Sequence, residues 1–146
     1  MIIDKSFKKW ESIKDLAISV DLGKGDGNAV LSIDNPFDDS GISIVEWNDD
    51  PNSDDLNAEP DGRGFSINLK YNSNFEELDN NFLDVLKNAL IYIKKNKKFF
   101  EIDEDSEKGF KFLNVYIIEG VDYSTNDSLN KTAKNFIDKF LNEILK

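Results

Sequence analysis

Cysteine and histidine are both missing from this 146-residue sequence. The absence of cysteine excludes disulfides, thiolate zinc sites and cysteine nucleophiles. The absence of histidine removes the commonest general base and the commonest transition-metal ligand, which excludes serine–histidine triads, zinc hydrolases and two-histidine iron sites. The absence of both residues therefore excludes most familiar catalytic arrangements. We predict a protein that is not an enzyme and has no cofactor.

Long apolar runs and basic residues are also scarce. No run approaches the roughly 18 apolar residues of a membrane-spanning helix, and no apolar signal region follows the N-terminus, which predicts a cytoplasmic protein with no membrane partner. The 18 Lys and Arg are outnumbered by 29 Asp and Glu, and the net charge is −11. Nucleic-acid binding depends on neutralising phosphates with basic side chains, so direct binding of nucleic acid is disfavoured. The same field would attract a basic protein.

The clearest structural signal is an alternating strand followed by a long amphipathic helix. Apolar residues at every second position from Phe65 to Tyr71 indicate a half-buried strand. Ser73 and Glu76 have the spacing of a capping box, which predicts that the helix begins there. The helix places one apolar stripe at steps of three and four residues. The stripe consists of Phe75, Leu78, Phe82, Val85, Leu86, Ala89, Leu90 and Ile93.

The other segments complete a single α+β domain over residues 1–146. We predict the order α-β-β-β-β-α-β-α, with a mainly antiparallel sheet of about five strands and helices on one or both faces. The remaining predicted elements are a short N-terminal helix carrying Phe7, Trp10, Ile13, Leu16 and Ala17, a hairpin over 18–33, a strand over 42–47, an acidic link over 101–109, a strand inside the sheet over 110–118, and a C-terminal helix over 129–145.

Acidic residues concentrate in one part of the chain. Between Asp34 and Gly62 there are ten Asp and Glu and no Lys or Arg. Such a block repels itself, so a basic partner, a cation or plain solvation must compensate for it. The segment from Asn48 to Gly64 is also a long polar loop, and loops of more than about 12–15 residues are usually functional or disordered.

A calcium site is one hypothesis for this loop. Asp50, Asn52 and Asp54 stand at positions one, three and five of a calcium-binding loop, and Asp61 stands at position twelve. Asp55 occupies the place of the usual glycine, however, and the final ligand is Asp rather than Glu. The segment therefore departs from the EF-hand pattern.

A metal-dependent nuclease is a second alternative. Pro60-Asp61, followed by Asn68 and Lys70, loosely resembles the PD-(D/E)XK nuclease motif, in which two acids hold a divalent metal and a lysine assists the attacking water. The resemblance covers about a dozen residues. Asn68 stands where the second metal-binding acid belongs.

The hypothesis that we favour from sequence is a non-enzymatic binding protein that neutralises a basic protein partner such as a toxin or a nuclease. Small size, acidity and the lack of catalytic histidine or cysteine are similar in type to bacterial immunity proteins, antitoxins and phage inhibitors. Carboxylates of the 48–62 loop would pair with basic side chains, and two aromatic residues would anchor the complex. The predicted partner-binding residues are Asp49, Asp50, Asp54, Asp55, Glu59, Asp61, Trp47 and Phe37.

Overall fold

The computed structural model describes residues 5–13, 16–21, 28–48 and 63–146. The central element is the ten-residue strand β4, whose alternating apolar side chains are all buried. The elements are η1 (Lys5–Ser12), β1 (Ala17–Val20), β2 (Asn28–Asp34), β3 (Gly41–Asn48), β4 (Arg63–Asn72), η3 (Phe75–Glu77), α1 (Asn80–Lys95), η4 (Lys97–Phe99), β5 (Phe100–Glu107), β6 (Phe110–Ile117) and α2 (Asn126–Ile144).

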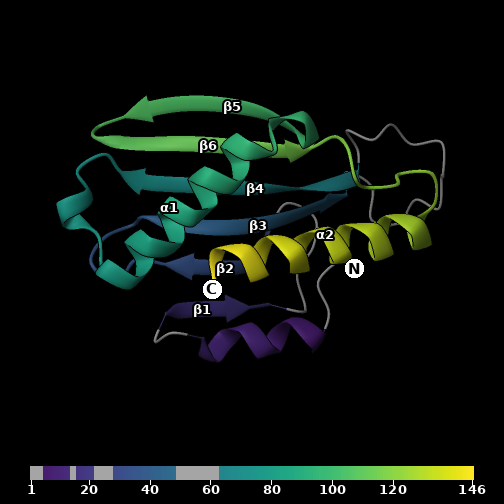
Figure 1. The fold of residues 1–146 in the computed structure, drawn as a ribbon, viewed down its shortest axis with the longest axis horizontal. Coiled ribbons are helices and arrows are strands. Elements are labelled where there is room, and N and C mark those ends of the chain that lie inside the picture. The colour runs from purple at the N-terminus through teal and green to yellow at the C-terminus, as the bar shows by residue number, and fades with distance from the viewer. Residues whose placement is uncertain (1–4, 14–15, 22–27, 49–62) are drawn as a thin grey trace.

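The strands form one six-stranded sheet in the order β1-β2-β3-β4-β6-β5. Every neighbouring pair is antiparallel. The first four strands follow one another as a meander, and the β5–β6 hairpin then adds beside β4, with β5 at the outer edge (Figure 1). The α+β class and the mainly antiparallel sheet are therefore confirmed, with six strands where about five were expected.

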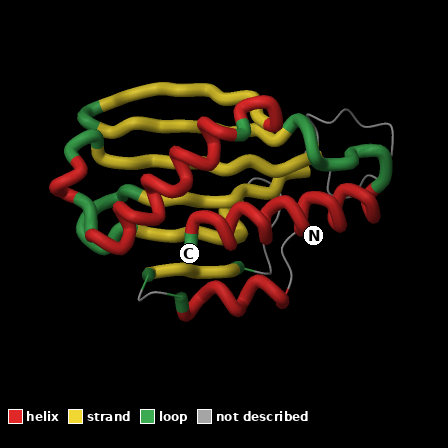
Figure 2. The backbone as a smooth tube through the Cα atoms, in the orientation of Figure 1, coloured by secondary structure: helices red, strands yellow, loops and turns green. Residues whose placement is uncertain are grey.

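Both long helices cover the same face of the sheet (Figures 1 and 2). On that face, Ile44 of β3, Ile67 of β4 and Val115 of β6 lie in register and are almost completely buried. They join Phe82 of α1 and Phe140 of α2 in one hydrophobic cluster. The opposite face carries a polar row that crosses all six strands. The row consists of Ser19, Ser32, Ser43, Asn68, Asn114 and Asp103.

The long central helix is present, but its predicted start is wrong. Asp79 caps α1, because its carboxylate accepts hydrogen bonds from the backbone N–H groups of Asn81 and Phe82. Ser73 instead donates its hydroxyl and backbone N–H to the carbonyl of Gly109, both at 2.8 Å. The expected capping box is therefore replaced by a tertiary contact, and residues 75–77 form a separate 3-10 turn.

The N-terminal helix is a 3-10 helix that ends at Ser12, earlier than predicted. Phe7 and Trp10 are buried as the pattern indicated, whereas Ala17 belongs to β1 and is exposed. The hairpin predicted over 18–33 is confirmed by the antiparallel pairing of β1 with β2. Pairing of Ile18 with Ile33 fixes its register.

The largest correction concerns residues 100–107. The segment predicted as an acidic link is the strand β5, which pairs with β6 along its whole length. The next strand, β6, lies between β4 and β5, so its predicted position inside the sheet is confirmed.

The C-terminal helix is confirmed as α2. Thr125 caps it by accepting a hydrogen bond from the N–H of Ser128, and Ile137, Phe140 and Ile144 pack into the core. No helix within the described ranges is long and apolar enough to cross a membrane.

Candidate functional site

Most of the predicted partner-binding residues lie outside the described residues. These are Asp49, Asp50, Asp54, Asp55, Glu59 and Asp61. Trp47 lies in β3, in register with Gly64 of β4. Phe37 lies in the turn between β2 and β3, and its side chain is 70% exposed.

A polar network holds the turn that presents Phe37. The Asp38 carboxylate accepts hydrogen bonds from the Asn35 side chain at 2.7 Å, the Ser40 N–H at 2.8 Å and the Asn72 side chain at 3.3 Å. Burial acts to raise the pKa of Asp38, but these hydrogen bonds outweigh it and the pKa is lowered. The turn is therefore rigidly tied to the end of β4, so Phe37 projects from a fixed base.

The two metal hypotheses have little support in the described part of the chain. There, no three acidic side chains gather closely enough to hold a metal ion. Asn68 and Lys70 lie on the face of β4 away from the helices, and Lys70 extends over aromatic rings. Asp50, Asn52 and Asp54 of the calcium hypothesis and Asp61, which both hypotheses use, are outside the described residues.

The described residues present another acidic surface, on the edge strand β5. Every second residue of this strand projects a carboxylate onto the face of the sheet that the helices leave uncovered, and all four are exposed. Each lies opposite a residue of β6, and three of those residues are aromatic. The register pairs are Glu101 with Tyr116, Asp103 with Asn114, Asp105 with Phe112 and Glu107 with Phe110.

The aromatic side chains of this surface already hold one cation. The Lys70 ammonium lies 5.2 Å from the ring centre of Phe110 and 5.8 Å from that of Phe112. Directly opposed side chains on neighbouring strands are about 5 Å apart at Cβ, so a cation near these rings is also close to the carboxylates of Asp105 and Glu107. A guanidinium group can stack on an aromatic ring and pair with a carboxylate at once. We call Glu101, Asp103, Asp105, Glu107, Phe110, Phe112 and Tyr116 the acidic–aromatic surface.

The outer edge of β5 carries no covering element among the described residues. No hydrogen bond from another described segment reaches the backbone of residues 101–107 outside the ladder with β6. An exposed edge of this kind can accept a further strand through its free N–H and C=O groups. The acidic–aromatic surface therefore borders a row of backbone groups that no other described segment covers, in which the Ser106 N–H is bound by the neighbouring Asp105 carboxylate.

The opposite edge of the sheet is closed by η1. The Glu11 carboxylate accepts a hydrogen bond from the Val20 N–H at 3.0 Å, and the Lys8 ammonium donates to the Val20 carbonyl at 2.9 Å. The hydrogen bond and charge of Lys8, together with the Val20 N–H, lower the pKa of Glu11 despite a small opposing effect of burial. The two edges therefore differ. Side chains of η1 bind the backbone N–H and carbonyl of Val20 in β1, whereas no other described segment binds the backbone of residues 101–107 outside the ladder with β6.

Sequence reasoning missed the β5 residues because it read them as a link. One signal could have revealed them: Lys108-Gly109 is a two-residue connection ending in glycine, followed by a strong strand. Such a connection is typical of a β-hairpin, which requires a partner strand before it.

None of the family models, curated proteins or solved structures compared with this chain matches it. The functional argument therefore depends on the surfaces of the molecule itself.

Proposed function

We propose that this chain is a non-enzymatic binding protein that neutralises a basic protein partner, in the manner of an immunity protein, an antitoxin or a phage inhibitor. The observation that carries the proposal is the acidic–aromatic surface beside the uncovered edge of β5. The proposed setting is the cytoplasm, where the partner's basic site would be blocked.

In the proposed complex, a basic segment of the partner lies along β5. Main-chain hydrogen bonds to the edge strand would supply affinity. Arginine side chains would pair with Asp105 and Glu107 and stack near Phe110 and Phe112. The net charge of −11 would speed the encounter, and the aromatic contacts would slow dissociation.

The acidic 48–62 loop remains a predicted second contact. The strands that flank it end at Asn48 and begin at Arg63, which pair with each other. Three residues further along β4, Ser66 is in register with Tyr116, which pairs with Glu101. The proposed interface would run from the loop onto this end of β5.

Affinity capture with charge-matched variants tests the proposal. The first variant removes four charges from β5 (E101Q/D103N/D105N/E107Q), and the second removes four from the loop (D49N/D50N/D54N/D55N). A control removes four exposed charges elsewhere (E76Q/D84N/E119Q/D127N). Each protein is used to capture binders from a lysate of the source cells at low and moderate salt, and captured proteins are identified by mass spectrometry.

The expected result is one stoichiometric basic protein that survives moderate salt, is retained by the control and is lost by the β5 variant. Its association with the β5 variant should also be slower and less dependent on salt. Loss by the loop variant alone would move the contact from β5 to the loop. Failure of the unmodified protein to capture any basic protein would reject the proposed function.

A further inference from the structure

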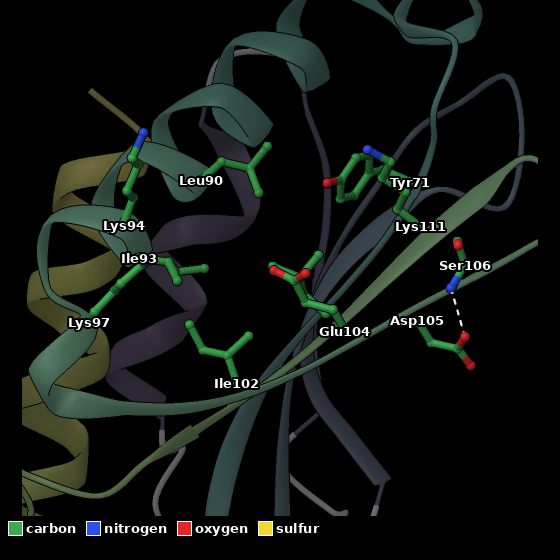
Figure 3. A pocket seen from close by; sticks show the side chains of 11 residues that line it. Tyr71, Leu90, Ile93, Lys94, Lys97, Ile102, Glu104, Asp105, Ser106 and Lys111 are labelled. Atoms are coloured by element: carbon green, nitrogen blue, oxygen red, sulfur yellow. Dashed lines mark hydrogen bonds between the residues drawn. The ribbon is translucent and has the colours of Figure 1, made fainter.

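A groove of about 590 Å³ lies between α1 and the helix-covered side of β5 and β6 (Figure 3). Its apolar lining comes from three elements: β4, α1 and the β5–β6 hairpin. The apolar side chains are Tyr71, Leu90, Ile93, Ile102 and Leu113. This volume is within the range of about 300–1,000 Å³ that is typical of small-molecule sites.

The groove lies where the helix-facing side of β5 is only partly covered. Along the helix side of β5, Phe100 is buried, Ile102 is half-buried and Glu104 is exposed. Leu113, the register partner of Glu104, is also only half-buried, as is Leu90 of α1. Partly exposed apolar side chains from both walls therefore meet in one hollow, and covering them would be favourable.

Three lysines surround this apolar lining: Lys94 and Lys97 on α1 and its extension, and Lys111 on β6. Lys94 and Lys111 lie on opposite sides of the groove (Figure 3). None of the three has a carboxylate of a described residue within 4.0 Å. In a chain of net charge −11, three ammonium groups at one hollow, with no ion-pair partner among the described residues, form a local site for an anion.

Glu104 and Tyr71 add two polar groups to the groove. The Glu104 carboxylate lies in the middle of the groove (Figure 3), whereas the Asp105 carboxylate is bound by the Ser106 N–H at 2.8 Å. Burial raises the pKa of Tyr71, and the charge of Glu104 raises it further, so the phenol stays protonated and can donate a hydrogen bond.

We propose that this groove binds an amphipathic organic anion, whose apolar body covers the lining and whose anionic group is held by Lys94, Lys97 and Lys111. Glu104 opposes the ligand's charge, so it limits affinity and disfavours multiply charged anions. Most of the acidic–aromatic surface is on the other face of the sheet, and Asp105 alone borders both sites. The proposed anion site does not depend on the proposed function.

A second hollow, of about 530 Å³ between α1 and α2, provides a comparison. It also has three lysines, Lys95, Lys139 and Lys146, and its lining includes Ile91 and Tyr92 beside the polar residues Asn88 and Asn142. Lys146 there is paired with Glu143 at 2.9 Å. Charge is therefore common to both hollows, and the first has the larger set of aliphatic side chains, Leu90, Ile93, Ile102 and Leu113, against Ile91 in the second.

The test uses two fluorescent probes of similar shape and the full chain. The anionic probe is 8-anilinonaphthalene-1-sulfonate, and its neutral counterpart is N-phenyl-1-naphthylamine. The variants are K94Q/K97Q/K111Q for the groove, K95Q/K139Q/K146Q for the second hollow, and K5Q/K98Q/K131Q as a charge-matched control. Melting temperatures establish that each variant is folded.

We expect the groove variant to bind the anionic probe about tenfold more weakly, from three exposed charge pairs of roughly 0.2–1 kcal/mol each, with little change for the neutral probe. Glu104→Gln should act in the opposite direction and strengthen binding of the anionic probe severalfold. Decanoate should displace the probe, and decanol should do so less well.

Three results would overturn the proposal. One is an equal loss of affinity in the groove variant and the charge-matched control. Another is loss confined to the variant of the second hollow. The last is weaker or unchanged binding in Glu104→Gln with its melting temperature preserved.

Discussion

The side-chain oxygen of Asn35 accepts a hydrogen bond from the backbone N–H of Asp79, 2.8 Å away. Asn35 is 4% exposed and stands at the end of β2, while Asp79 caps α1, 44 residues later in the chain. The amide of Asn35 also donates to Asp38 and to the carbonyl of Glu77. One asparagine thus fixes the tip of the β2–β3 hairpin to the start of the central helix.

Replacing Asn35 with alanine should lower the free energy of unfolding by about 2 kcal/mol, because buried polar groups left without partners cost roughly 1–3 kcal/mol each. Urea unfolding measures this change. Asn135→Ala, at an exposed position of α2, is the control and should be neutral or slightly stabilising. A loss for Asn35→Ala no greater than for the control would contradict the proposed role of the hydrogen bonds.

Asp38 should make the fold sensitive to acid. Its pKa is lowered from the ordinary 3.8, because hydrogen bonds to the carboxylate outweigh burial. A carboxyl with a lower pKa in the folded chain stabilises the fold above its unfolded pKa, and that stabilisation is lost as the pH falls through the folded value.

The stability difference between the unmodified protein and Asp38→Asn should therefore be constant from pH 7 to roughly pH 5 and should shrink below roughly pH 4. Urea unfolding at a series of pH values measures it. Asp39→Asn, at the exposed neighbouring position, corrects for the general effect of removing one charge. A difference that stays constant down to roughly pH 3 would contradict the assignment.

Lys108 is the one non-glycine residue with positive φ among those described, at 54° in the turn between β5 and β6. Lysine is strained in this region, whereas Asn-Gly is the preferred sequence of such two-residue turns. Lys108→Asn should raise the free energy of unfolding by about 0.5–1 kcal/mol. Lys108→Ala removes the same charge but keeps the strain, so an equal gain in both variants would show that charge, not backbone, is responsible.

Gly120 should tolerate alanine less well than Gly109. Both have positive φ, 87° and 85°, but a Cβ at Gly120 would lie 3.3 Å from the Phe136 ring, while at Gly109 it would meet no atom within 4 Å. Phe136 also packs edge-on against Phe99 and Phe100, so it has little room to move.

Gly109→Ala should therefore cost about 1 kcal/mol from backbone strain alone, and Gly120→Ala should cost at least about 1 kcal/mol more from overpacking. Thermal and urea unfolding of the two variants measure the difference. Equal losses would mean that Phe136 moves aside freely.

The parts of the fold in which apolar residues recur at a regular spacing could be predicted from the sequence. β4 alternates strictly because one face is buried, and the core positions of α1 recur at helical spacing for the same reason. β5 has no such pattern. It lies at an edge where only its first residues are covered, so only Phe100 and Ile102 need be apolar. Pairing with β6 overrides the poor strand propensity of its Asp and Glu residues.

The capping error has a comparable origin. Ser73 and Glu76 satisfy a local rule, but Ser73 bonds to Gly109, 36 residues away, and Asn35 holds the N–H of the true cap. Neither contact is visible in a local window of sequence. For the candidate site, the acidity of the chain was evident from its composition. The registration of the β5 carboxylates opposite the aromatic residues of β6 could not be predicted. That registration depends on strand pairing.

The unlike edges of the sheet restrict how the molecule can associate with itself. At the β1 edge, Glu11 and Lys8 already occupy the main-chain groups of Val20, so another strand cannot join there without displacing them. At the other edge, five of the eight residues of β5 are Asp or Glu, and two copies meeting along this strand would bring like charges together. Acidification would remove that repulsion. At neutral pH, the charge of β5 would oppose pairing with its own copies and, in the proposed complex, would favour a chain of opposite charge.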